Sequence, residues 1–555
     1  MILTMLNVKE SRLKILIDLI AEKAVTYADD DQKIMSPVGK KQKWLIDLRP
    51  VLLDVEGLNI ITDIFWDEFE DQLPFQIGGM EVAAVPVVTA LLMKAEQRGI
   101  KTNGFIIRKE RKTSGLGKLI EGNVTVDPIF LVDDVMNSGS SLEKARVALQ
   151  QMDKQIDRVF VVLNFESQAG KQWANQTKIK VDHLLNLDPF EVELSNKEWN
   201  PPRVVYEVAW KFFEPGAFPF HIVPKSTPLV VGDKIFMGTE AGKMVCVDRL
   251  TGEAIWKYDV KTTHQKGIWS SPAYHDGKLF FGAYNGIAYC LNAEDGSEVW
   301  KNSCCEFIGS SPLIVPEHGL MYLGLEHQRP RQMGSNAAFD IETSERVWER
   351  AQRKYQHGSA AYYKPKDLVI WGNADHDVTA YEALTGKIVW KQETDRSHKY
   401  PPLVDEERKL VITTSFDGNI YIFDVETGEK KAAIQTDDIC YTTPLIAEGK
   451  IFAGSGDRHM YIIDADNFEL IKKMDCRARV YSSPRFIDGH VVFGTGGGRI
   501  IELDPDTLKI AAQAQLPDAI TNAISASPDE DVLYVSTCMN ELYAVNRARV
   551  DDNDA

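Results

Sequence analysis

Two adjacent carboxylates at the end of an apolar run are the side chains in this sequence best suited to chemistry. In FLVDDVMNSGSS, residues 130–141, Asp133 and Asp134 follow four apolar residues and precede a turn of small residues. Adjacent like charges repel, and burying them is costly unless a cation or hydroxyl groups satisfy them. A glycine- and serine-rich turn that opens a helix offers backbone N–H groups and hydroxyls to an anion. The stretch therefore predicts a ligand site.

A second stretch combines positive charge with glycines. It is IRKERKTSGLGKLIEG, residues 107–122, and its first basic residues are Arg108, Lys109, Arg111 and Lys112. Gly115 and Gly117 would allow such a loop to move. By itself a basic loop is as readily a solvated surface segment as a lid over an anion.

The elements that would position these residues follow an α/β rhythm up to about residue 200. Apolar strand patterns such as IFLVDD and RVFVVLNF alternate with helical patterns such as SLEKARVALQQM. Nearly all-apolar strands suit a parallel sheet covered on both faces by helices. The polar, proline-marked segment LSNKEWNPPR then predicts a boundary near Arg203. We expect one α/β domain over residues 1–200.

Beyond the boundary the sequence repeats. Units such as VCVDRLTGEAIWK (245–257) and TAYEALTGKIVWK (379–391) recur, each preceded by a segment such as WSSPAYHDGKLFFGA. The acid or amide that anchors each unit recurs every 40 to 48 residues, at Asp248, Asn292, Asp340, Glu382, Asp424, Asp464, Asp504 and Asn546. About four short strands in each period predict the blades of a β-propeller. We expect eight blades over residues 204–550.

The eighth repeat ends after its third strand, and the segment 204–212 offers the missing fourth. Trp210 then occupies the position of the Trp that follows "TG" in other units, and pairing the two ends would close the ring. We expect these Trp rings to pack between neighbouring blades, at Trp256, Trp300, Trp348 and Trp390.

The repeats resemble those of quinoprotein-like propellers, in which an Ala/Val-x-Asp-x-x-Thr-Gly-x-x-x-Trp pattern recurs. The resemblance implies an architecture more than a cofactor. Quinone-dependent dehydrogenases are usually exported and carry long inserts, and neither feature is present in this sequence, so we expect no pyrroloquinoline quinone. Cys304 and Cys305 resemble the vicinal cysteines of some such enzymes, but a reduced pair lining a blade is favoured. The propeller is expected to be a binding scaffold for a ligand or protein that the sequence does not identify.

The first domain resembles the type I phosphoribosyltransferases, specifically the orotate phosphoribosyltransferase branch. Four segments carry the resemblance in family order: GKKQKWLIDLR (39–49), QIGGMEVAAVP (76–86), IRKERKTSGLGKLIEG (107–122) and FLVDDVMNSGSS (130–141). They are similar, respectively, to the family's base segment, pyrophosphate loop, mobile catalytic loop and phosphoribosyl pyrophosphate (PRPP) motif.

The resemblance implies a role for each matching residue. Lys109, Lys112 and Asp133 would be catalytic, and Trp44 and Lys40 would bind the base. Asp133 and Asp134 would lie beside the ribose hydroxyls and their Mg²⁺. PRPP would be held by Gly78, Gly79, Arg108, Lys109, Lys112, Asp133, Asp134, Asn137, Ser138, Gly139, Ser140 and Ser141. In the family the mobile loop reaches into the partner subunit, so a homodimer is implied.

Three positions depart from the family pattern. Ser114 stands where the mobile loop has a His, and Ser167 stands where orotate enzymes have an Arg that helps to hold the base. The pyrophosphate loop lacks its usual Lys, since none lies between Gln76 and Ala83. Retention of PRPP binding is therefore expected, with orotate recognition impaired.

Composition limits the remaining classes of function. The net charge of −18 argues against a nucleic-acid partner. Lys9, Glu10, Arg12, Lys14 and Asp18 interrupt the apolar N-terminal segment, so we expect an amphipathic helix instead of a signal peptide. Seven scattered cysteines do not suggest a disulfide framework, and no apolar run is long enough to span a membrane. We expect a cytoplasmic protein.

Two functions remain open on the sequence. The basic, glycine-hinged loop favours a Mg²⁺-dependent phosphoribosyltransferase that acts on a nucleobase-like acceptor and releases pyrophosphate. The missing His and Arg favour a non-catalytic regulator that senses PRPP or a nucleotide and acts through the propeller. A quinoprotein oxidoreductase is disfavoured.

Overall fold

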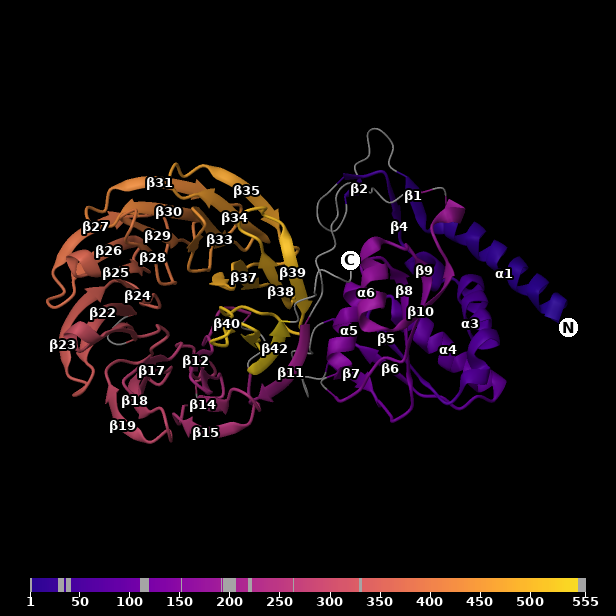
Figure 1. Cartoon of the computed structure of the whole chain (residues 1–555), viewed down its shortest axis with the longest axis horizontal. Coiled ribbons are helices and arrows are strands. Elements are labelled where there is room, and N and C mark those ends of the chain that lie inside the picture. The colour runs from indigo at the N-terminus through magenta and orange to yellow at the C-terminus, as the bar shows by residue number, and fades with distance from the viewer. Residues whose placement is uncertain are drawn as a thin grey trace. The chain divides into compact units, whose positions relative to one another are not determined.

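The computed structural model describes residues 2–27, 34–35, 41–109, 119–150, 152–190, 192, 206–217, 222–262, 264–328 and 332–547. Apart from Gln515–Pro517, the chain divides between Val204 and Val205 into two compact units (Figure 1). Residues 193–205 and 548–555 lie outside the described ranges, so the domain limits 1–200 and 204–550 stay predictions.

The first unit is built on a six-stranded sheet in the order β10-β9-β8-β5-β6-β7. Its strands are β5 (Gln76–Met80), β6 (Gly104–Ile107), β7 (Ile120–Gly122), β8 (Ile129–Met136), β9 (Arg158–Asn164) and β10 (Lys180–Leu185). All neighbours pair in parallel except β7, which is antiparallel to β6. The predicted α/β fold with a parallel sheet is confirmed.

Helices and short elements complete this unit. The helices are α1 (Ile2–Lys23), α2 (Arg49–Leu52), α3 (Val55–Phe69), α4 (Ala84–Arg98), α5 (Ser140–Gln150) and α6 (Gln168–Thr177), with 3₁₀ turns η1 (Glu70–Gln72) and η2 (Asp188–Phe190). Two small ribbons pair β1 (Val25–Tyr27) with β4 (Trp44–Ile46), and β2 (Ile34–Met35) with β3 (Lys41–Gln42).

Alternation along the central strands produces two cores, one on each face of the sheet. Phe130 and Val132 of β8 belong to the cluster that includes Phe65 of α3 and Leu91 of α4. Their neighbours, such as Leu131, belong to the cluster that includes residues of α5. Since successive side chains of a strand point to opposite faces, an all-apolar strand needs cover on both. The carboxyl end of β8 is thereby fixed between two packed layers.

The second unit is a ring of eight four-stranded antiparallel sheets, which confirms the predicted eight-bladed propeller (Figure 1). Blades one to four comprise β12 (Leu229–Val231), β13 (Lys234–Gly238), β14 (Lys243–Asp248), β15 (Ala254–Asp259); β16 (Ala273–His275), β17 (Lys278–Gly282), β18 (Ile287–Asn292), β19 (Glu298–Ser303); β20 (Leu313–Val315), β21 (Leu320–His327), β22 (Met333–Asp340), β23 (Arg346–Gln352); β24 (Ala360–Tyr363), β25 (Leu368–Asn373), β26 (Asp377–Glu382) and β27 (Ile388–Glu393). The 3₁₀ turns η3 (Pro316–His318) and η4 (Lys364–Lys366) lie in blades three and four.

Blades five to eight follow the same order from the centre outward. They comprise β28 (Leu403–Asp405), β29 (Leu410–Thr414), β30 (Asn419–Asp424), β31 (Lys430–Gln435); β32 (Leu445–Ala447), β33 (Lys450–Gly454), β34 (His459–Asp464), β35 (Leu470–Asp475); β36 (Arg485–Ile487), β37 (His490–Gly494), β38 (Arg499–Leu503), β39 (Ile510–Gln515); and β40 (Ser525–Ala526), β41 (Val532–Ser536), β42 (Glu541–Arg547) with β11 (Tyr206–Phe213). The strand β11 pairs antiparallel with β42, from Tyr206 opposite Arg547 to Phe213 opposite Glu541. The predicted closure of the ring is confirmed.

Five of the eight blades carry a Trp at the repeat position, and this ring packs between blades, as predicted. Trp256 donates its indole N–H to the carbonyl of Ala293 in the next blade, at 3.3 Å. Trp210 of the eighth blade does the same to Arg249 of the first, at 3.1 Å. An added Cβ on Gly252 would lie 2.6 Å from the Trp210 ring, so only glycine admits the ring there. The Trp of one blade and the glycine of the "TG" turn in the next blade therefore contact each other directly.

Where a repeat has two hydroxyl residues before its proline, as in WSSP and GSSP, the two have separate tasks. Ser270 accepts a hydrogen bond from the Gly282 N–H of its own blade, at 3.2 Å. Ser311 accepts one from the Ser271 N–H of the preceding blade, at 2.9 Å. One hydroxyl therefore fastens the innermost strand to its blade, and the next joins neighbouring blades around the axis.

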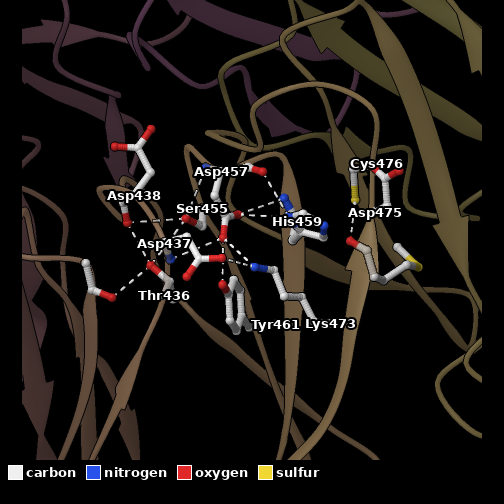
Figure 2. A network of polar contacts seen from close by, with 12 residues as sticks. Thr436, Asp437, Asp438, Ser455, Asp457, His459, Tyr461, Lys473, Asp475 and Cys476 are labelled. Atoms are coloured by element: carbon white, nitrogen blue, oxygen red, sulfur yellow. Dashed lines mark hydrogen bonds and ion pairs between the residues drawn. The ribbon is translucent and has the colours of Figure 1, made fainter. Parts of the chain in front are cut away.

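A polar network in blade six has a structural explanation (Figure 2). The carboxylate of Asp457 accepts hydrogen bonds from the backbone N–H of His459, the Tyr461 hydroxyl at 2.6 Å and the Lys473 ammonium at 3.2 Å. In blade five Asp417 accepts from Tyr421 in the same way, at 3.0 Å. Because the contact repeats, it belongs to the blade design.

Two further features bear on the sequence predictions. Cys304 and Cys305 are free thiols, as are the other five cysteines. Over the described ranges, no helix combines the length and apolar character that crossing a membrane requires.

Candidate functional site

The acidic pair lies at the carboxyl end of β8, in the middle of the parallel sheet. Asp133 is 7% exposed and accepts the Asp134 N–H at 3.0 Å, while Asp134 accepts the Val135 N–H at 2.8 Å. Burial raises the pKa of Asp133 well above its usual range, and the Asp134 charge adds to the effect. Burial also raises the pKa of Asp134. Among the described residues neither carboxylate forms an ion pair, so the site holds two neighbouring acids whose charges no ion pair offsets.

The turn after the pair leads directly into α5. Gly139 has φ +72°, and a Cβ there would lie 2.9 Å from the ring of buried Trp173. Asn137, Ser140 and Ser141 are exposed, and the Ser138 and Ser140 hydroxyls are 2.8 Å apart. Three serine hydroxyls and the Asn137 amide thus lie at the first turn of a helix, an arrangement that suits an anion.

Ser167 is committed to this turn by its hydroxyl. It donates to the Asn137 carbonyl at 2.6 Å and, as the N-cap of α6, accepts the Gly170 N–H at 3.1 Å. Gly170 packs equally closely, because its Cβ would lie 2.5 Å from the Asn137 carbonyl oxygen. Ser167, which stands at the family's Arg position, therefore stabilises the 137–141 turn through the Asn137 carbonyl.

Gly78 and Gly79 lie inside β5 instead of in the loop that follows it. A Cβ on Gly78 would lie 2.3 Å from the Phe105 ring, and one on Gly79 would lie 2.6 Å from the Cβ of Ala84. Close packing of β5 against β6 and α4 explains both glycines. Their predicted contact with PRPP stays a prediction, and the loop itself consists of the residues between Met80 and Ala84.

That loop carries a carboxylate which contacts the basic residues of the next strand. Glu81 accepts the backbone N–H of Lys109 at 3.0 Å and lies 3.9 Å from an Arg108 guanidinium nitrogen. Glu121 lies 3.6 Å from the same nitrogen. The Arg108 Nε is buried and has no partner among the described residues. Lys109 is exposed, and its charge lowers the pKa of Asp133, which places it toward the acidic pair.

The segment predicted to hold the base runs alongside. Trp44 packs edge-on against Phe165, with ring centroids 5.7 Å apart, beyond the carboxyl end of β9. Sequence reasoning did not select Asp47 and Arg49, which form a two-point ion pair with bonds of 2.7 and 2.6 Å. The charge of Asp47 raises the pKa of Asp134, so this pair borders the acidic site. Their place in the IDLR motif was the available signal.

Lys40 and Lys112, with Arg111, Ser114, Gly115 and Gly117 of the basic loop, lie outside the described residues. The structure brings together Asp133, Asp134, the 137–141 turn, Lys109 and Arg108 at one edge of the sheet. Trp44 stands beside them.

The donor set fits a Mg²⁺ ion shared with a substrate. No group of three or more His, Cys, Asp or Glu side chains among the described residues forms a metal cage. Mg²⁺ commonly binds through one or two carboxylates and completes its shell with substrate oxygens and water. Asp133, which is buried, and Asp134, which is half-buried, form no ion pair in the described part of the chain and provide that number of protein ligands.

Comparisons with known proteins separate along the same division of the chain. An orotate phosphoribosyltransferase from Pyrococcus horikoshii is 33% identical over 134 residues, which is 24% of this chain and 69% of that protein. One from Rhodopirellula baltica is 28% identical over 162 residues, which is 28% of this chain and 83% of that protein. The predicted resemblance of the first domain is confirmed.

The propeller has its own relatives. The family described as "Outer membrane protein assembly factor BamB" matches residues 206–268 and 261–467, and a "Domain of unknown function (DUF5074)" matches 389–551. BamB from Moraxella catarrhalis superposes with a TM-score of 0.50 at 15% identity, covering 63% of this chain and all of that one. A quinohemoprotein alcohol dehydrogenase from Pseudomonas putida gives 0.50 at 13%, covering 62% and 77%. These matches show the fold. The chain belongs, through its N-terminal part, to the orotate phosphoribosyltransferase family, and joins to that part a BamB-like eight-bladed β-propeller.

Proposed function

We propose that the N-terminal domain transfers phosphoribose from PRPP to a nucleobase-like acceptor and releases pyrophosphate in a Mg²⁺-dependent reaction. The observation that carries the proposal is the pair of buried Asp133 and half-buried Asp134 at the end of β8, which form no ion pair with any described residue and are followed at once by the hydroxyl-lined turn into α5. A ribose with two hydroxyls, a 5′-phosphate and a pyrophosphate-bound cation matches those donors in charge and order.

In this reaction the bond from C1 of the ribose to pyrophosphate breaks, and a bond from C1 to an acceptor nitrogen forms. A bound Mg²⁺ would neutralise pyrophosphate charge. Asp133 would stabilise positive charge that develops at C1, and the 137–141 turn would hold the 5′-phosphate. Arg108, Lys109 and Lys112 would neutralise the leaving group, with the Gly78–Gly79 strand beneath and Trp44 and Lys40 beside the base.

Orotate is proposed to be a poor acceptor. Ser167 has no cationic group, and its hydroxyl already serves the Asn137 carbonyl and the α6 cap. Losing a hydrogen bond to a charged substrate group costs roughly 1.5–3 kcal/mol, about ten- to hundredfold in rate or affinity. We further propose that the protein is a cytoplasmic homodimer whose propeller serves as an interaction or sensing module without pyrroloquinoline quinone.

A non-catalytic regulator that senses PRPP or a nucleotide is the second candidate. The Glu81 carboxylate favours it, because this acid lies near the Arg108 guanidinium that an enzyme would turn toward pyrophosphate and accepts the backbone N–H of Lys109.

Calorimetry and turnover assays on the full chain distinguish these functions. We expect Mg²⁺-dependent PRPP binding that weakens at least a hundredfold in Asp133→Asn/Asp134→Asn and is unchanged in Asp71→Asn, an exposed acid of the same domain. Pyrophosphate release should appear with some base of a panel, and much less with orotate. Binding without turnover would select the regulator, and absence of PRPP binding would refute both.

A further inference from the structure

The propeller contains a cavity of about 740 Å³ around its axis. All eight blades contribute to its wall, through the residues just before the innermost strand and, in some blades, through that strand itself, from Leu229 in blade one to Ser525 in blade eight. A volume of several hundred Å³ is typical of small-molecule sites.

The charge on the wall is opposite to that of the whole protein. The sequence has 81 acidic and 63 basic residues, yet the wall carries Lys225, Lys266, Lys399 and Arg485 and, among the described residues, no Asp or Glu. The cavity is thus a positive pocket in a negative protein, an arrangement that attracts anions.

Two of these lysines have no counter-ion of their own. Lys225 pairs with buried Glu240 at 2.8 Å, and His357 of the wall pairs with Glu326 at 2.8 Å. Lys266 and Lys399 form no ion pair with any described residue. Their ammonium groups rest on aromatic faces instead, Lys266 at 4.7 Å from the Trp269 centroid and Lys399 at 4.7 Å from that of Phe416.

Burial makes these two charges costly. It lowers the pKa of Lys266, against a smaller opposing effect of Glu326. It lowers the pKa of Lys399 too, and the charge of Lys266 lowers it further, against an opposing effect of Glu326. An anion held between them would offset both desolvation and mutual repulsion.

Aromatic rings cover the rest of this region. Tyr400 and Tyr441 are in edge-to-face contact at 5.0 Å, and Trp269 and Tyr284 at 5.3 Å, all four on the cavity wall. Rings beside cations favour a ligand that has a flat face as well as a negative charge.

We propose that the axial cavity binds a small aromatic anion, with Lys266 and Lys399 holding the charged group and the Trp269 and Tyr441 regions contacting the ring. Resting on the proposed function, the transferase domain supplies one molecule of this class, its nucleoside monophosphate product. The cavity is then a second site, separate from the acidic pair.

The test is calorimetry on the full chain saturated with Mg²⁺ and PRPP, so that the transferase site is occupied. Uridine and adenosine monophosphates and orotate are the aromatic anions, and uridine and ribose 5-phosphate lack the charge and the ring, respectively. We expect binding of at least one aromatic anion, weakened tenfold or more in Lys266→Met and in Lys399→Met. Lys399→Arg should still bind the aromatic anion. So should Lys430→Met, which alters an exposed lysine of the same blade.

The outcomes separate this proposal from the proposed function. Affinity unchanged in Lys266→Met/Lys399→Met, or ribose 5-phosphate bound as tightly as the nucleotides, would overturn it. If PRPP does not bind but an aromatic anion still binds through the lysines, the proposed function fails and the cavity site stands. Circular dichroism melts of each variant confirm that it is folded.

Discussion

At the scale of single residues, the proposed site carries one group that opposes its own ligand. Glu81 lies near Arg108 and holds the Lys109 N–H, so its charge competes with pyrophosphate. Glu81→Gln keeps an acceptor for that N–H but removes the charge. We expect Mg²⁺–PRPP to bind roughly two- to fivefold more tightly by calorimetry, since partly exposed charge pairs contribute up to about 1 kcal/mol.

Glu96→Gln is the matched control, because it removes an exposed acid from α4 in the same unit. Weaker binding in Glu81→Gln would show instead that Glu81 helps to bind the substrate complex.

A buried histidine gives the propeller a pH-sensitive contact. Burial lowers the pKa of His398 to about 4, and its ring contacts Thr413, Thr394 and the Thr414 carbonyl. The unfolded chain binds a proton near pH 6.5, so folding stability is lost as pH falls from there to about 4, by roughly 3 kcal/mol in all.

Other blades place an isoleucine against the equivalent glycine, as Ile308 contacts the Gly282 position and His398 the Gly372 position. We therefore expect His398→Ile to flatten the fall in melting temperature between pH 7 and pH 4.5. His275→Asn, in another blade and only partly buried, should leave the slope unchanged. If the melting temperature of His398→Ile fell with pH as steeply as that of the unaltered protein, His398 would not be the group responsible.

The site residues that could be located from the sequence are those that lie together in one contiguous motif. Asp133, Asp134 and the turn that follows form a contiguous motif, so their place at a strand end was predictable. The task of Ser167 was not, because it depends on a carbonyl thirty residues earlier, at Asn137. Glu81 was not selected either, since its importance comes from its contact with Arg108 in the neighbouring strand.

At the scale of elements, the repeats predicted the blades because each unit brings its own turns and strands. Spacing alone could not assign the two hydroxyls of each SSP segment, one to its own blade and one to the next. For Gly78 and Gly79 the local sequence suggested a loop. The two residues lie instead in β5, where they pack against Phe105 and Ala84. Pattern reasoning identifies elements well where local and tertiary demands agree.

At the scale of the whole molecule, the ring depends on the strand that joins its two ends. Removing residues 204–212 would leave β42 with an open edge and remove the Trp210 contact with Arg249. We expect the melting temperature of the propeller to fall by several degrees, with PRPP binding by the other unit unchanged. The milder variant Trp210→Ala should lower it in the same direction. An unchanged melt in both would contradict closure through β11.

The same closure sets the order in which the parts of the chain can fold during synthesis. The strand β11 emerges from the ribosome early, yet its partner β42 follows only after the seven intervening blades, since Phe213 pairs with Glu541. At about 5–20 residues per second, roughly 20–60 s separate the two strands. During that time the transferase unit, already complete, can fold, whereas β11 must remain available with an unpaired edge. A nascent chain that stalls within the last blade would therefore carry a finished first unit and a ring that cannot shut.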